Sequence, residues 1–232
     1  MKIYHYSSTT FEYIGDSEAA PSPLAPGEYL MPPNTTTVSP PTLVANQAAV
    51  WDGSSWRIVP DFRSLPACCI DSNGFFLTSY TMCLGDTFTS TIIQASPPLS
   101  GIKKPQWVNG AWVSGQTLDE VKADKLAALA SYRFDVETAG ISVGGVNIKT
   151  DRESQAMLTG AYTLMTMDPS RQINWKGGNK WSHTDNVTLA AVALAVGNHV
   201  QSCFDKEEAH YNAIVVLTSI EEVKNYDFST GW

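Results

Sequence analysis

Charged residues are scarce in this 232-residue chain. Asp, Glu, Lys and Arg make up 16% of it, compared with about 25% in ordinary soluble domains. Basic residues are the scarcer kind, 15 against 23 acidic ones, and the formal net charge is −8. Proteins that bind nucleic acid neutralise phosphates with clustered Lys and Arg. The composition therefore argues against nucleic acid as a partner and predicts a surface covered largely by Ser, Thr, Asn and Gly.

Cysteines are few, and long apolar runs are missing. Cys68, Cys69, Cys83 and Cys203 form no CxxC pair and have no histidine at zinc-ligand spacing, so we expect no zinc site. We expect four free, buried thiols in a reducing cytoplasm. No run approaches the 18 apolar residues of a spanning helix, and residues 1–16 lack the apolar core of a signal peptide. We therefore expect a chain made in a cytoplasm, without membrane insertion.

What the first half does contain is proline and alternating aromatic residues. Residues 1–16 alternate polar and apolar side chains, which predicts a β-hairpin with its turn at Ser7 to Thr10. Seven prolines between Pro21 and Pro41 remove too many N–H donors for a helix or a central strand. We expect an ordered, extended wrapping segment with a short strand at 27–30. Disorder is the alternative, but Tyr29 and its neighbours give the segment apolar surface to bury.

Two tryptophan hairpins follow a common pattern. Asp52-Gly53 separates Trp51 from Trp56, and Asn109-Gly110 separates Trp107 from Trp112. Such turns favour tight hairpins. The equivalent tryptophans are 56 residues apart, and the double prolines that precede them are 57 apart. This predicts a degenerate duplication, with β-modules at 1–64 and 65–116. Segments 74–84 and 87–95 are expected to pair as strands of the second module.

The tryptophans allow two interpretations. In each hairpin they could pair across the strands and clamp a small core, or they could form platforms that stack on sugars or on a partner protein. Five aromatic residues are therefore candidates for partner binding: Trp51, Trp56, Trp107, Trp112 and Tyr29.

Residues 117–232 carry the signals of an α+β domain. Three Ser/Thr-x-x-Glu capping boxes begin at Thr117, Thr150 and Ser219, and each predicts a helix start. Helices are expected at about 118–137, from the second box to about 167, and from Thr184 or Asp185 onward. Glycine pairs predict hairpins at 141–148 and 173–181. The predicted class is α+β, with tandem antiparallel β-modules followed by a helical domain with short hairpins.

The sequence contains few candidates for catalytic or metal-binding residues. His199 and Cys203 lie one helical turn apart, but no third orienting group is visible, so packing is favoured over a catalytic pair. Asp71 to Gly74 resembles the start of a calcium loop without its glutamate, which favours a plain turn. The pairs Asp119-Glu120, Glu207-Glu208 and Glu221-Glu222 are interpreted as first-turn carboxylates that complement helix dipoles. We expect neither catalytic residues nor a metal or cofactor.

Several blocks resemble proteins of tailed bacteriophages. Residues 117–232, with TDRESQAMLTGA, NWK, NHVQSCF and the terminal GW, resemble a C-terminal domain of unassigned biochemical function in tail-fibre-associated proteins. GEYLMPPNTTTVSPP and AAVWDGSSWRIVPD, echoed by PPLSGIKKPQWVNGAW, resemble the N-terminal modules of tail fibre assembly chaperones. The resemblance implies a non-enzymatic accessory protein that binds a trimeric tail fibre and assists its folding.

The doubled N-terminal module departs from the shorter chaperones of this type, which leaves a second hypothesis open. The chain could instead be a structural or receptor-binding tail component that contacts host surface glycans through its tryptophan hairpins. Both hypotheses place the protein in the host cytoplasm during assembly. The first leaves open whether it then remains at the fibre tip, and the second keeps it on the virion tail.

Overall fold

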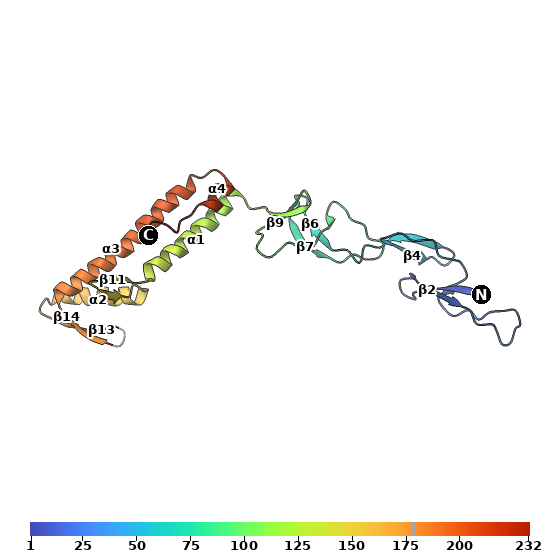
Figure 1. Cartoon of the computed structure of the whole chain (residues 1–232), viewed down its shortest axis with the longest axis horizontal. Coiled ribbons are helices and arrows are strands. Elements are labelled where there is room, and N and C mark those ends of the chain that lie inside the picture. The colour runs from blue at the N-terminus through green and yellow to red at the C-terminus, as the bar shows by residue number, and fades with distance from the viewer. Residues whose placement is uncertain (178–179) are drawn as a thin grey trace. The chain divides into compact units, whose positions relative to one another are not determined.

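The computed structural model describes residues 1–177 and 180–232, which divide into two compact units, Met1–Gly115 and Gln116–Trp232 (Figure 1). The first unit consists of small antiparallel sheets, and the second is helical with short hairpins, so the α+β class is confirmed. The finer division into modules 1–64 and 65–116 stays a prediction.

The first unit contains two three-stranded sheets, each with its earliest strand in the centre. The first has the order β2-β1-β3 and the second β7-β6-β8. Two further hairpins, β4-β5 and β9-β10, carry the tryptophans. The bounds of the ten strands are β1 Lys2–Tyr6, β2 Tyr13–Glu18, β3 Thr35–Thr36, β4 Gln47–Trp51, β5 Trp56–Pro60, β6 Ala67–Ile70, β7 Phe76–Tyr80, β8 Ile92–Gln94, β9 Pro105–Val108 and β10 Ala111–Ser114.

Two expectations for this unit were wrong. Residues 27–30 form no strand: Tyr29 makes a single bridge to Pro21, and the strand that joins the sheet is β3, at Thr35–Thr36. Segments 74–84 and 87–95 do not pair with each other, because β7 and β8 flank β6 on opposite sides. The centre of that sheet is the sequence ACCI, whose buried Ala67, Cys68 and Ile70 fit a strand covered on both edges.

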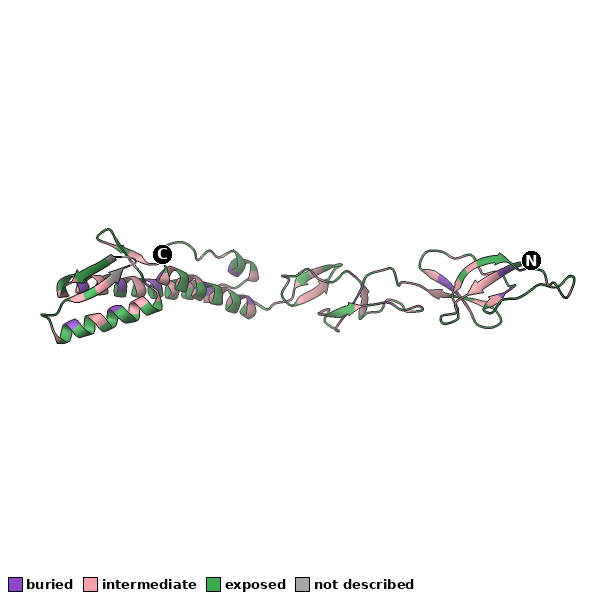
Figure 2. Ribbon diagram, turned by 90° about the horizontal axis from the view of Figure 1, so that it is seen from below, coloured by how far each residue is buried: buried purple, intermediate pink, exposed green. Residues whose placement is uncertain are grey.

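The core of the first unit is small. Its fully buried members are mostly Ala, Ile and Cys, for example Ile3 and Cys68 at the centres of the two sheets. Figure 2 shows how few buried residues each sheet contains. Side chains of this size each contribute only about 1 to 2 kcal/mol when buried, so the aromatic clusters described below must supply much of the packing.

The second unit is built on two long helices. Its elements are α1 Leu118–Thr138, β11 Ile141–Val143, β12 Val146–Ile148, α2 Arg152–Met167, β13 Ile173–Gly177, β14 Lys180–Thr184, α3 Asn186–Val215 and α4 Ile220–Asn225. The boxes at Thr117 and Ser219 form as expected. The turn between β13 and β14 lies outside the described residues.

The box expected at Thr150 was wrong by one residue. Asp151 caps α2 and accepts the backbone N–H of Ser154. The Thr150 side chain is instead fully buried, where it donates to the carbonyl of Glu137 and accepts the N–H of Gly140 at 2.9 Å. Tertiary contacts thus removed the hydroxyl from the helix start, and the next carboxylate took over the cap.

Two apolar clusters hold this unit together. Val121, Leu129, Ile214 and Val223 join α1, α3 and α4, and Trp232 packs against this cluster. Leu158, Met165, Leu189 and Val196 join α2 to the first half of α3. By length and composition α3 is also a helix that could cross a membrane, a property that core helices of soluble proteins share.

Candidate partner-binding surface of the tryptophan modules

The four tryptophans pair within their hairpins as cross-strand neighbours. Trp51 lies opposite Trp56, with ring centroids 5.2 Å apart and planes at 63°. Trp107 lies opposite Trp112 at 5.0 Å and 64°. Edge-to-face pairs of this kind add about 0.5 to 1.5 kcal/mol beyond the area they bury. The two pairs are near copies of each other, so the cross-strand pairing is confirmed, while their use as a binding platform stays a prediction.

A third ring closes each cluster from the neighbouring sheet. Tyr13, at the start of β2, meets Trp56 at 5.8 Å and 88°. Phe76, at the start of β7, meets Trp112 at 5.5 Å and 88°. In the first cluster Tyr6 also stacks on Trp51, at 6.1 Å and 22°. Each hairpin is thereby fastened to its own three-stranded sheet through aromatic contacts.

Backbone hydrogen bonds attach each tryptophan hairpin to its sheet as well. The N–H of Trp51 donates to the carbonyl of Phe11 at 2.9 Å, and the N–H of Trp107 donates to that of Gly74 at 2.8 Å. Phe11 and Gly74 both have left-handed backbones, with φ of 59° and 85°. A larger residue would fit poorly at position 74, because a Cβ there would lie 3.0 Å from the Trp107 carbonyl oxygen. The duplication predicted from the tryptophan spacing therefore extends to backbone hydrogen bonds.

Each module also exposes an aliphatic side chain at the same place. Ile14 on β2 is 67% exposed and Leu77 on β7 is 62% exposed. Each directly follows the ring that closes its cluster, Tyr13 or Phe76. Both β2 and β7 are edge strands of their sheets. An edge strand with an exposed aliphatic residue is a surface to which another chain can add a strand.

Tyr29 lies apart from the tryptophans. It belongs to a projecting loop, residues 19–34, whose two limbs are joined by the Pro21–Tyr29 bridge and by the N–H of Leu30 donating to the Ala20 carbonyl at 2.8 Å. Tyr29 is 44% exposed, and Leu24 in the same loop is 93% exposed. The structure brings Trp51 and Trp56 into one cluster and Trp107 and Trp112 into another, but it does not bring Tyr29 to either.

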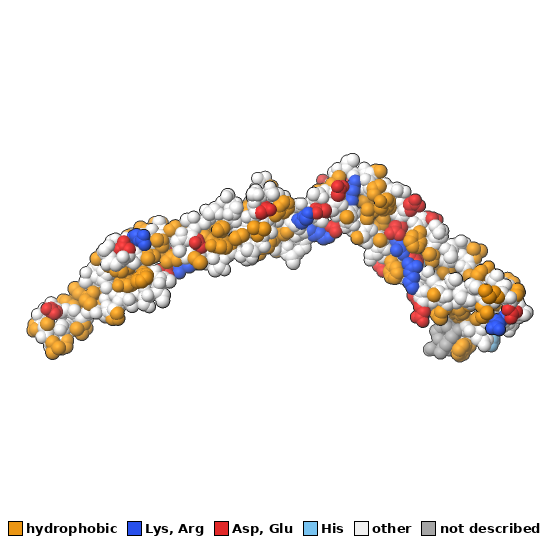
Figure 3. All heavy atoms as spheres, turned by 180° about the vertical axis from the view of Figure 1, so that it is seen from behind, with side chains coloured by type: hydrophobic (Ala, Val, Ile, Leu, Met, Phe, Trp, Pro, Cys, Tyr) orange, Lys and Arg blue, Asp and Glu red, His pale blue; other side chains and the backbone are white. Residues whose placement is uncertain are grey.

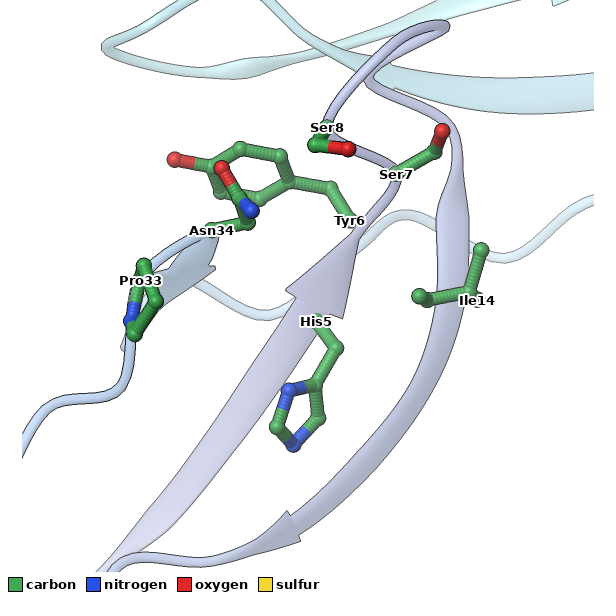
Figure 4. A pocket seen from close by; sticks show the side chains of 7 residues that line it. All are labelled: His5, Tyr6, Ser7, Ser8, Ile14, Pro33 and Asn34. Carbon is green, nitrogen blue, oxygen red and sulfur yellow. The ribbon is translucent and has the colours of Figure 1, made fainter.

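A shallow depression lies beside the first cluster. It encloses about 430 Å³ and is lined by His5, Tyr6, Ser7, Ser8, Ile14, Pro33 and Asn34. Figure 4 shows that its walls come from β1, the following turn, β2 and the segment before β3. Hydroxyl, imidazole and amide groups suit a small polar ligand. The sequence pointed to none of these residues except through the alternation of the first hairpin, because Pro33 and Asn34 reach the site only through folding.

Charges in the first unit are paired locally. The Arg63 guanidinium hydrogen-bonds both Glu12 and Asp61, and it holds the pKa of each carboxyl below its ordinary value. Asp52 accepts the N–H groups of Ser54 and Ser55, which lowers its pKa strongly. On the face of the first unit drawn in Figure 3, the charged side chains are scattered spots on a surface that is mostly uncharged. The surface of this unit thus suits neutral or apolar ligands better than highly charged ones.

His199 and Cys203 lie close together in the second unit. Cys203 lies 3.9 Å from Nε2 of His199, which also faces the Glu137 carbonyl at 3.2 Å. Burial raises the pKa of the Cys203 thiol, which disfavours the thiolate a nucleophile needs.

In the first unit, Asp71 accepts the N–H groups of Asn73 and Phe75, so its segment is an ordinary turn. Among the described residues no group of three or more His, Cys, Asp or Glu is placed to hold a metal ion.

The pair Glu207-Glu208 was placed wrongly in a first helical turn, because it lies deep inside α3. Glu207 bonds Arg133 of α1 at 3.0 Å. Arg133 also pairs with Glu137, which is fully buried and receives a second guanidinium from Arg152 at 2.9 Å. This carboxylate joins α1 to α2 and, through Arg133, to α3.

The family model that matches this chain covers part of the second unit only. Residues 120–230 match the family model of a domain of unknown function, DUF4376. Searches of curated proteins and of solved structures found no match. The matched range begins just inside α1 and ends two residues before the C-terminal Trp232.

Proposed function

We propose that this protein is a non-enzymatic phage tail protein that binds a tail fibre and assists its folding and assembly. The carrying observation is that both tryptophan modules present an edge strand with an exposed aliphatic residue at the equivalent position, Ile14 and Leu77. Two matched edges are suited to one extended partner that repeats, as the chains of a trimeric fibre do.

Several properties of the first unit support strand addition. Its edge strands offer backbone N–H and C=O groups, and its scaffold is held rigid by aromatic clusters, which reduces the ordering cost of binding. Its few charges are mostly paired with one another. Affinity would then come from main-chain hydrogen bonds, with Ile14 and Leu77 as side-chain anchors. The fibre is the partner, and the host cytoplasm is where the two chains meet.

The test is co-expression with the fibre polypeptide encoded beside this protein. We expect soluble trimeric fibre only when this protein is present, and less of it with the double variant Ile14→Asp/Leu77→Asp. Val146→Asp is the matched control, because Val146 is also an exposed aliphatic residue, at 61%, but lies on β12 in the second unit. Equal yields of soluble trimer with and without the protein would overturn the proposal.

A second function has one specific observation in its favour. The depression beside His5 and Asn34 is small and polar, which suits a sugar unit of a host surface glycan and a protein that stays on the virion. Binding to purified surface polysaccharide in the absence of fibre, abolished by the double variant His5→Ala/Asn34→Ala, would favour this tail-component role. Mass spectrometry of purified virions decides whether the protein stays on the particle.

A further inference from the structure

The end of the first tryptophan hairpin is held by a loop of the second module. Pro60, the last residue of β5, accepts a 2.9 Å hydrogen bond from the backbone N–H of Gly85. Two residues later, the Phe62 ring packs against Phe88, with ring centroids 5.0 Å apart and planes at 48°. Gly85 and Phe88 both belong to the loop 81–91, which connects β7 to β8. This loop therefore receives the end of the preceding hairpin, and we call the contact the junction.

The first module has a loop in the same place, because residues 19–34 connect β2 to β3 as 81–91 connect β7 to β8. Near its start each loop has a buried apolar residue, Ala19 at 6% exposure and Met82 at 3%. In Figure 1 the loop of the first module projects beyond β2. The two loops are thus equivalent parts of the duplicated module.

Backbone hydrogen bonds align the two loops at their ends. The N–H of Tyr6 donates to the carbonyl of Asn34 at 2.9 Å. In the second module the N–H of Ile70 donates to the carbonyl of Thr91, also at 2.9 Å. Tyr6 and Ile70 are themselves equivalent, since each directly follows the register shift of its hairpin. The last residues of the two loops, Asn34 and Thr91, therefore correspond to each other.

This alignment places Met31 where the second module has Phe88, because each lies three residues before the end of its loop. Phe88 is partly buried and packs on Phe62, whereas Met31 is 45% exposed. Its neighbours Tyr29 and Leu30 are exposed as well, at 44% and 51%. We call Tyr29, Leu30 and Met31 the open site. The first module thus has the loop half of a junction, with its apolar side chains in solvent.

A second copy of this chain does not supply the missing half. Phe62 of each copy already packs against its own Phe88. The other tryptophan hairpin ends at Ser114, and residues 115–117 separate it from α1, which begins at Leu118. No aromatic residue follows that hairpin within this span. The occupant that the junction specifies is therefore a different polypeptide.

We propose that the open site docks the end of a β-hairpin of the tail fibre, in the way that the loop 81–91 receives Phe62. The segment that it takes is extended and carries an aromatic side chain two residues after its last paired residue. This inference rests on the proposed function, which supplies the fibre as the partner. It adds a contact that is distinct from the edge strands with Ile14 and Leu77.

The chemistry of the open site fits an aromatic ring. The thioether of Met31 is polarizable and makes favourable contacts with aromatic rings, and Tyr29 offers a ring of its own. Glu28 is the only charged residue in the sequence of the loop 19–34, so covering the site removes little charge from water. Five prolines restrict the backbone of this loop, which lowers the entropy lost when a partner binds.

A peptide test separates the open site from the fibre. The probe is a synthetic peptide of this chain's own residues 57–64, RIVPDFRS, which contains the aromatic residue of the junction. In the full chain with isotope-labelled methionine methyl groups, we expect millimolar peptide to shift the Met31 methyl resonance, which Met31→Leu assigns. Met167 is the matched control, because it is 78% exposed but lies on α2, and its resonance should not move.

The same peptide with Phe62→Ala should leave the Met31 resonance unchanged. No shift at Met31 with the parent peptide, or an equal shift with the alanine peptide, would overturn the inference whatever the fibre does.

The fibre test measures affinity. Fibre trimer is produced by co-expression with the parent chain, separated from it, and titrated calorimetrically with the full chain and its variants. We expect Met31→Lys to weaken binding by about tenfold or more, because the ammonium group would have to be desolvated against an aromatic ring. Leu24→Lys is the matched control, since Leu24 lies in the same loop at 93% exposure but outside the open site, and it should leave the affinity unchanged.

The two possible failures are distinguishable. Fibre that binds the parent chain and Met31→Lys equally well would overturn the inference and leave the proposed function standing. Fibre that does not bind the parent chain at all would overturn the proposed function and the fibre as occupant of the open site. Tryptophan fluorescence confirms that both lysine variants keep the packing of the first unit.

Discussion

The indole N–H of Trp56 donates a 2.8 Å hydrogen bond to the backbone carbonyl of Val38. Trp112 makes the same bond, also at 2.8 Å, to Ser96. Both carbonyls lie two residues beyond the third strand of their sheet, since β3 ends at Thr36 and β8 at Gln94. The bond ties the tryptophan hairpin to the segment that leads into it, so each module is closed by a polar contact as well as by aromatic packing.

Replacing the indole N–H donor of Trp56 should lower the stability of the module that contains Trp51 and Trp56. Trp56→Phe keeps a ring but removes the N–H and leaves the Val38 carbonyl without its partner, which we expect to cost about 1 to 2 kcal/mol. Urea unfolding followed by tryptophan fluorescence measures it. Leu24→Ala, at a site 93% exposed, serves as the control with no expected change. An unchanged urea midpoint for Trp56→Phe would show that the bond contributes nothing to stability.

Gly74 should tolerate a methyl group worse than Gly53 does. Both have positive φ, 85° and 99°, so alanine is strained at either site. Only at Gly74 does the new Cβ also meet a backbone oxygen, that of Trp107 at 3.0 Å, whereas at Gly53 it meets nothing within 4 Å. We expect Gly74→Ala to destabilise the protein by about 1 kcal/mol or more beyond Gly53→Ala. Comparing the two thermal midpoints tests this; equal midpoints would argue against the close approach.

Glu137 should be the most sensitive carboxylate of the second unit. Removing one partner of a buried ion pair costs about 3 to 5 kcal/mol. We expect Glu137→Gln to fall near the lower end, because Arg133 keeps Glu207 and Arg152 is 54% exposed. Loss of helical signal on heating measures the effect. Glu153→Gln, on the exposed first turn of α2, should change little, and equal effects of the two variants would contradict the role of burial.

Acid should weaken the N-terminal caps of α2 and α3 and so lower the stability of the second unit. Hydrogen bonds from the Ser154 and Thr188 backbones hold the pKa values of Asp151 and Asp185 below their ordinary values. A carboxyl with a lowered folded pKa stabilises the fold above its unfolded pKa of about 3.9, and that contribution is lost as pH falls through the lower folded value.

The test is the thermal midpoint of the helical signal between about pH 2 and 6. Asp185→Asn keeps an N-cap acceptor but removes the titration, so its midpoint should fall less steeply below about pH 4. Parallel curves for the variant and the parent chain would mean that this carboxylate does not contribute to the acid response.

Thiol reactivity should be dominated by one residue. Cys68 and Cys203 are buried, and burial raises the pKa of each thiol, whereas Cys83 is exposed. The expectation of four buried thiols was thus wrong at Cys83, which is exposed, and at Cys69, which is only partly buried. Iodoacetamide in native buffer should label Cys83 first, as peptide mass spectrometry can show, and Cys83→Ser should abolish the fast phase. Fast labelling of Cys203 would contradict its burial.

Local chemistry made much of the fold predictable. Asn109-Gly110 supplies the left-handed pair that a tight hairpin needs, with φ of 50° and 84°. Thr117 and Glu120 form the reciprocal cap that their spacing predicts. Such signals act within four residues, so they are present in the sequence before any tertiary contact forms. The candidate aromatic pairs were predictable for the same reason, because a two-strand hairpin fixes its own neighbours.

By itself the sequence determined the α+β class, the positions of most turns and caps, and the duplicated hairpins. Only the tertiary structure decided that β6 lies between β7 and β8, that Thr150 is buried beneath Glu137, and that Tyr29 lies on a separate loop. These outcomes depend on contacts between residues far apart in the chain. Turn and cap signals carry no information about which distant surfaces will bury one another, and that choice is made by packing the whole chain.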